Sequence, residues 1–138
     1  MGNEHLSEKV SVNINASTLS GIDLLVDNGY FSNRSDFINQ ALRESLQKHR
    51  STLDRIIEKN SEIGRQSSDC WFIGVLCLEK RDIEAALRSA HAMAITGYGV
   101  LMIGETINEQ DLFAAVHAIR VKGKVVCNKN IKAHYGLK

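Results

Sequence analysis

The sequence has no long hydrophobic run. The longest apolar stretch, Trp71 to Leu78, is far shorter than the roughly 20 residues that a membrane-spanning helix requires. The chain also does not open with a charged segment followed by an apolar one, as a secretory signal does. We therefore expect a cytoplasmic protein with no membrane partner, and the hydrophobic content of 43% predicts a globular fold.

Cysteine is scarce, and its spacing is uninformative. The chain has an odd number of cysteines, Cys70, Cys77 and Cys127, and no two of them form a C-x-x-C pair. This pattern suggests neither a disulfide framework nor a zinc site. We expect reduced thiols in the core.

The N-terminal third lacks an excess of positive charge. Residues 1–50 contain five basic and six acidic side chains, so bulk electrostatics does not favour nucleic-acid binding by this part of the chain. The segment Arg120 to Lys138 differs, with six Lys and Arg and no Asp or Glu. It could hold phosphates non-specifically, or it could be a solvated terminus.

Residues 9–14 alternate polar and apolar side chains, which predicts a strand with Val10, Val12 and Ile14 on its buried face. A helix should follow, capped by Asn15 or Ser17 and ending near Asn28 and Gly29. Lys9, Ser11 and Asn13 would then lie on the other face of the strand. Lys, Ser and Asn can hydrogen bond to guanine, to either base type and to adenine, respectively.

Ser35 is the expected N-cap of a second helix, with Asp36 at the positive end of the helix dipole. Its apolar positions include Leu42 and Leu46 and continue with a coiled-coil-like spacing to Ile63, so the helix is expected to extend well past residue 50. The segment 64–68 should end it and form a linker.

Three apolar segments in the second half each begin with a glycine: Gly74, Gly99 and Gly123. Their spacings of 25 and 24 residues predict an internal repeat, with helices over about 82–93 and 108–119. This alternation predicts parallel strands, and their continuous apolar character predicts a sheet covered on both faces. The expected fold class is mixed α/β, with about three parallel β-α units at the C-terminus, resembling a short leucine-rich solenoid.

An isolated six-residue strand has unpaired backbone groups at both edges and cannot stand in water alone. The local sequence offers no hairpin partner, so a second copy of the chain must supply it. Two copies would form an antiparallel ribbon that fits the major groove of B-DNA. The alternative interpretation is an ordinary edge strand whose polar face is simply solvated.

Residues 9–46 resemble the ribbon-helix-helix family of MetJ, Arc and the CopG-type repressors. The resemblance rests on Val-Ser-Val-Asn-Ile, a helix, and the segment from Gly29-Tyr30 through Asn33-Arg34-Ser35-Asp36-Phe37-Ile38. It implies an obligate homodimer on double-stranded DNA, with base contacts from Lys9, Ser11 and Asn13. It also implies a phosphate contact at the start of the second helix, which falls on Asn33, Arg34 and Ser35.

The nickel-responsive branch of that family also joins this module to an α/β domain. Its His-x-His ligand pair is absent here, and His91, His117 and His134 lie far apart in the sequence. The expected strand order also differs from that sensor. We expect no metal and no cofactor. The sequence also contains neither of the glycine-rich motifs that bind nucleotide phosphates, G-x-G-x-x-G and G-x-x-x-x-G-K-[ST].

The expected organisation is a DNA-binding domain over residues 1–50, a helical extension and linker over 51–68, and an oligomerisation or effector domain over 69–138. The strand edges of the last domain can be covered by another subunit, so tetramers or larger assemblies are also expected as an alternative to the dimer. The expected function is a sequence-specific, repressor-like transcriptional regulator and not an enzyme. The alternative is an antitoxin-like or segregation protein that binds a protein partner and represses its own promoter.

Overall fold

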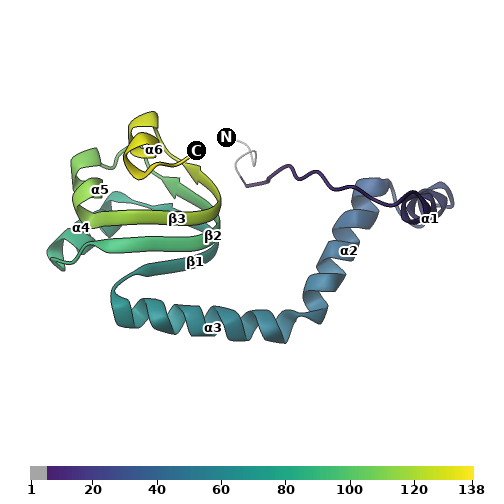
Figure 1. The fold of residues 1–138 in the computed structure, drawn as a ribbon, viewed down its shortest axis with the longest axis horizontal. Coiled ribbons are helices and arrows are strands. Elements are labelled where there is room, and N and C mark those ends of the chain that lie inside the picture. The colour runs from purple at the N-terminus through teal and green to yellow at the C-terminus, as the bar shows by residue number, and fades with distance from the viewer. Residues whose placement is uncertain (1–5) are drawn as a thin grey trace. The chain divides into compact units, whose positions relative to one another are not determined.

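The computed structural model describes residues 6–138, which divide into two compact units. One unit is Lys9–Ile56, and the other combines residues 6–8 with Ile57–Lys138. The order of elements is three helices followed by three strands that alternate with three further helices (Figure 1). No helix within residues 6–138 is long and apolar enough to cross a membrane.

The first unit contains α1 (Ala16–Asp27) and α2 (Arg34–Lys48). Asn15 caps α1 by accepting a hydrogen bond from the backbone N–H of Ser17, as one of the two sequence alternatives predicted. The helix ends at Asn28 and Gly29, where Gly29 has a φ of 81°. This left-handed conformation favours glycine and ends the helix as expected.

The helical extension past residue 50 is present, but it is a separate helix. The backbone turns at His49, and α3 (Arg50–Ser67) begins at the next residue. His49 bonds through its ring Nδ1 to the carbonyl of Ser45, with 2.9 Å between the atoms. Because α3 continues to Ser67, the predicted linker over 64–68 is almost entirely helical.

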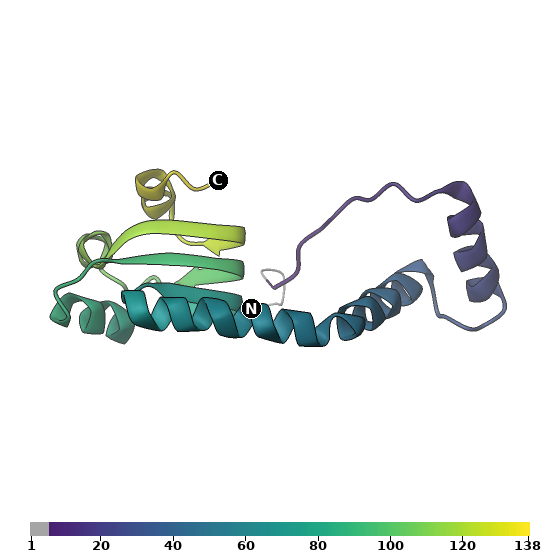
Figure 2. The ribbon, with the colours of Figure 1, turned by 60° about the horizontal axis from the view of Figure 1, so that its bottom comes forward.

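The second unit is built from β1 (Cys70–Leu78), α4 (Lys80–Arg88), β2 (Met93–Ile103), α5 (Glu109–Ala115), β3 (Val116–Val126) and α6 (Lys129–Tyr135). The strands form one parallel sheet in the order β1-β2-β3. Figure 2 shows the three strands stacked as successive turns. This confirms the parallel β-α repeat, although α4 and α5 each end several residues before the predicted position.

Glycine occupies the same position in every strand. Gly74, Gly99 and Gly123 are register partners with φ values of 101°, 127° and 143°. These values are accessible essentially to glycine alone, and each strand bends sharply near its middle (Figure 1). The expectation that these glycines introduce the strands is therefore wrong, because each strand begins before its glycine and continues beyond it.

The core lies on the inner side of the bent strands. Each following helix contributes to it, through Ile83 of α4, Leu112 of α5 and Ile131 of α6. The outward side chains are less covered, with Ile73, Val75 and Tyr98 about half exposed. A sheet covered on both faces is therefore the wrong expectation for the single chain, because alternate side chains point away from the core.

Candidate nucleic-acid interface

Residues 9–14 are extended and exposed in the single chain and are not assigned as a strand. Val10 is 76% exposed and Val12 is 73% exposed, while Ile14 is 38% exposed. The predicted strand thus differs from the observed segment, and the physical reason is that strand pairing needs a neighbour. In the interpretation that the sequence favours, that neighbour belongs to a second chain.

Lys9, Ser11 and Asn13 are exposed along the same segment. In an extended segment, successive side chains alternate between two sides. These three therefore share the side opposite Val10 and Val12. No hydrogen bond or ion pair connects them to any other residue within 6–138, so their polar groups are available for a ligand.

The start of α2 is the second part of the candidate interface. Asn33, rather than Ser35, is the N-cap, since its side chain accepts a 2.8 Å hydrogen bond from the backbone N–H of Asp36. The carboxylate of Asp36 in turn accepts a hydrogen bond from the N–H of Ser32. The predicted helix start was therefore two residues late, because both Asn and Ser are good caps and sequence alone does not separate them.

This capping leaves two backbone donors in the first turn. The N–H groups of Arg34 and Ser35 have no acceptor among residues 6–138. Free N–H groups at the positive end of a helix dipole are suited to a phosphate. Because α2 has 15 residues, its dipole is fully developed at this end.

The side chain of Arg34 is engaged within the unit. Its Nε and Nη2 atoms lie 2.7 Å and 2.8 Å from the two carboxylate oxygens of Asp23 on α1. The hydrogen bond from Arg34 lowers the pKa of Asp23, and the same contact raises the pKa of Arg34. This pair is not evident in the sequence, because only the contact of α1 with α2 brings the two residues together.

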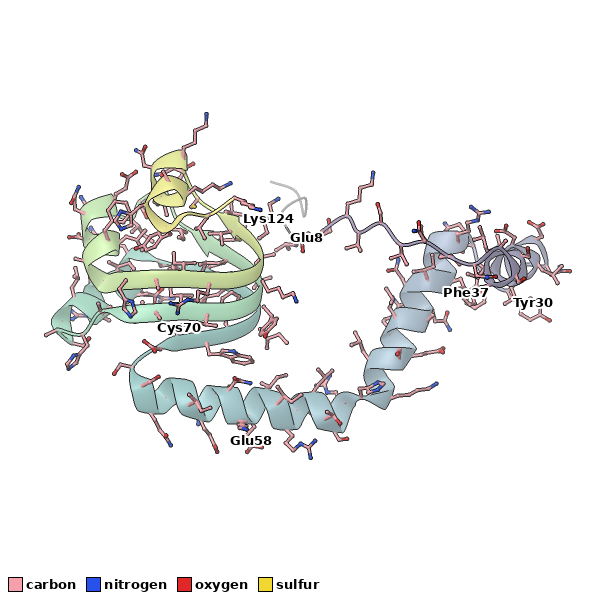
Figure 3. The ribbon with its side chains drawn as sticks, in the orientation of Figure 1. Glu8, Tyr30, Phe37, Glu58, Cys70 and Lys124 are labelled. Carbon is pink, nitrogen blue, oxygen red and sulfur yellow. The ribbon has the colours of Figure 1, made fainter. Side chains whose placement is uncertain are left out.

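A bidentate arginine and carboxylate pair fixes orientation as well as distance. The Arg34 guanidinium therefore braces α1 against α2 at the point where α2 begins. Phe31 and Phe37 add an edge-to-face ring contact at the same connection, with centroids 4.9 Å apart. Figure 3 places Tyr30 and Phe37 beside this connection between the helices.

Apart from this brace, the first unit buries very little. Ile22 is its one buried hydrophobic residue. Large apolar side chains on both helices are exposed, including Leu24 at 65%, Leu42 at 56% and Leu46 at 59%. A 48-residue unit with so small a core has little hydrophobic stabilisation of its own.

The thiols and histidines of the second unit do not gather into a ligand set. No group of three or more His, Cys, Asp or Glu side chains within residues 6–138 is placed to hold a metal ion. All three cysteines are free thiols, and Cys77 is exposed, which differs from the expected core position. Burial raises the pKa of Cys70 and of Cys127.

Comparison with known proteins gives one result that covers most of the chain. A family model described as the ribbon-helix-helix transcriptional regulator family matches residues 5–132. No curated protein and no solved structure was found to match the chain. The matched range includes most of the second unit, so the similarity extends well beyond the N-terminal segment.

Proposed function

The chain belongs to the ribbon-helix-helix transcriptional regulator family, and we propose that it is a repressor-like regulator that reads a specific DNA sequence as a homodimer. Two copies of residues 9–14 pair antiparallel in this proposal and enter the major groove as a two-stranded ribbon. The proposal assigns no catalytic role to any residue.

The observation that carries this proposal is the exposure of the apolar side of residues 9–14. Val10 and Val12 are about three-quarters exposed, and Leu42 and Leu46 of α2 are more than half exposed. Fully burying each such side chain is worth about 1.5–3 kcal/mol. Pairing two copies would bury both sets at once, and it would satisfy the backbone groups of the extended segment.

Once the ribbon is formed, its outer side presents Lys9, Ser11 and Asn13 twice, related by the two-fold axis. The side chains read base edges, with Asn13 suited to adenine and Lys9 to guanine. The backbone N–H groups of Arg34 and Ser35 hold a phosphate on each side and set the register. The Asn33 side chain stays on Asp36 and keeps these donors in place.

Replacing Asn13 by Ala tests the base-reading role. We expect Asn13→Ala to lose specific operator binding while the dimer persists, because a bidentate base contact is worth about 1–3 kcal/mol of discrimination. Gln47→Ala is a matched control, since it also removes an exposed amide but lies near the end of α2. Selection of binding sites from random DNA provides the readout, and an unchanged sequence preference in Asn13→Ala would overturn the assignment.

Replacing Val12 by Asp tests the ribbon itself. We expect Val12→Asp to prevent dimerisation, because an unpaired carboxylate would be buried between the strands and the helices. Ser11→Asp carries the same charge on the other side of the segment and should keep the dimer. Sedimentation analysis measures both variants, and a stable, folded Val12→Asp dimer would show that the strand register is wrong.

For the second unit we propose a role in assembly or in sensing an effector. Its buried core joins side chains from all three strands and all three following helices, so this unit has the packing of a folded domain. A toxin-binding segment would usually be disordered and charged when free. That difference favours the regulator over the antitoxin-like alternative.

A further inference from the structure

Before the bend, the three strands present six outward side chains in two rows. Trp71, Thr96 and Arg120 are register partners, as are Ile73, Tyr98 and Lys122. The outward surface therefore changes character across the sheet. It is apolar and aromatic on β1, it carries a threonine and a tyrosine on β2, and it is cationic on β3.

A hollow of about 390 Å³ lies between the side chains of β2 and β3. Thr96, Tyr98, Arg120 and Lys122 form its walls, and Gly97 and Val121 complete its lining. The hollow is shallow and open to solvent, so a ligand would lie on the outward surface of the sheet. The hollow lies within one unit, so its geometry is set by the register of adjacent strands.

The two cations of the hollow are not neutralised by the protein. Neither Arg120 nor Lys122 forms an ion pair with any residue in the range 6–138. They lie two residues apart on one strand and share its outward side. Two adjacent unpaired cations create a positive potential that favours an anion, and the Arg120 guanidinium suits the paired oxygens of a carboxylate or phosphate.

The opposite wall offers an aromatic surface. Tyr98 is 52% exposed, and its ring contacts that of Trp71 edge to face, with centroids 6.5 Å apart. Trp71 also packs against α3, where a Cβ placed on Gly64 would lie 3.6 Å from the Trp71 Cβ. The tyrosine ring thus contacts Trp71 and is half exposed to solvent, and its exposed part can stack with a planar group.

We propose that this hollow binds a small planar organic anion. Arg120 and Lys122 hold the carboxylate or phosphate of the ligand, while its flat part stacks on Tyr98 and the Thr96 hydroxyl donates or accepts a further hydrogen bond. This goes beyond the DNA-binding proposal and does not depend on it, because every residue involved lies in the second unit.

The protein supplies its own reporter, because Trp71 is its single tryptophan and touches the Tyr98 ring. The full-length chain is titrated with adenosine monophosphate and, separately, with 2-naphthoate, while Trp71 emission is recorded. The first probe carries a phosphate and the second a carboxylate, so the pair distinguishes the two anion types. We expect at least one of them to give a saturable change that weakens with added salt.

Two controls separate the parts of the ligand. Adenosine lacks the anion, and inorganic phosphate lacks the ring. If adenosine monophosphate binds, each of these two controls should bind at least about tenfold more weakly than it does. If phosphate alone bound equally well, the planar part of the proposal would be wrong. If neither planar anion gave a saturable change, the whole proposal would be overturned.

Variants locate the site. Arg120→Gln and Lys122→Gln should each weaken binding about tenfold or more, and Tyr98→Leu should weaken it while keeping an apolar side chain on β2. Arg88→Gln on α4 is the matched control, since it removes one exposed positive charge outside the hollow. Equal binding by Arg120→Gln and Arg88→Gln would place the anion elsewhere and refute the assignment. DNA binding by these variants is measured in parallel, and its outcome bears only on the ribbon.

Discussion

Replacing Gly99 by Ala should strongly destabilise the second unit. A Cβ at Gly99 would lie 2.0 Å from the carbonyl oxygen of Gly74 on the neighbouring strand, well inside van der Waals contact, so the strands would have to separate by about 1 Å. Such overpacking costs about 1–3 kcal/mol. The φ of 127° adds about 1–3 kcal/mol of backbone strain for any residue with a side chain. The free energy of unfolding should therefore fall by about 2–6 kcal/mol.

The first of the three register-partner glycines provides a matched control. Gly74 has a φ of 101°, but a Cβ there would meet no atom within 4 Å, because no strand precedes β1 within residues 6–138. Gly74→Ala should cost only the backbone strain of about 1–3 kcal/mol, and Gly123→Ala should resemble Gly99→Ala. Urea denaturation followed by Trp71 emission measures all three. If Gly99→Ala cost no more than Gly74→Ala, the close approach of the strands would be refuted.

Two further predictions concern titrating groups. The hydrogen bond from Arg34 lowers the pKa of Asp23 below its usual value, so Asp23→Asn should destabilise the first unit at neutral pH. The difference in stability between the variant and the wild type should vanish as the pH falls through the lowered pKa. A difference in thermal stability that does not depend on pH would contradict this. Burial raises the pKa of Tyr135 to about 12, where its hydroxyl donates to the carbonyl of Val116 at 2.7 Å. Subtracting the ultraviolet titration curve of Tyr135→Phe from that of the wild type should leave a step at about pH 12. The neutral phenol of Tyr135 stabilises the fold, and this contribution is lost as the pH rises from 10 toward that value.

The repeat was readable from the sequence because its signal is periodic. Glycines 25 and 24 residues apart predict equivalent positions in successive turns, and Gly74, Gly99 and Gly123 are indeed register partners. What those glycines do could not be predicted. A glycine among apolar residues marks either the turn before a strand or an irregularity inside it, and the three positive φ values at one level of the sheet decide between the two.

The N-terminal unit shows the opposite limit. Its helices and the Asn15 cap follow from local sequence, but the position of the α2 cap depended on a choice between two good capping residues. The contact between Asp23 and Arg34 joins residues eleven positions apart on different helices, and no helical periodicity predicts it. The pairing of residues 9–14 depends on a second chain, so it remains a prediction.

The two units differ in how they are stabilised, and this difference bears on regulation. The second unit buries a continuous core, with Ile95 and Leu101 fully inaccessible, whereas Ile22 is the buried hydrophobic residue of the first. If the first unit gains its stability by pairing, its folded fraction and its apparent affinity for DNA both rise with protomer concentration. Any association or ligand of the second unit that raises the local concentration of the paired segments would then strengthen DNA binding without touching the ribbon.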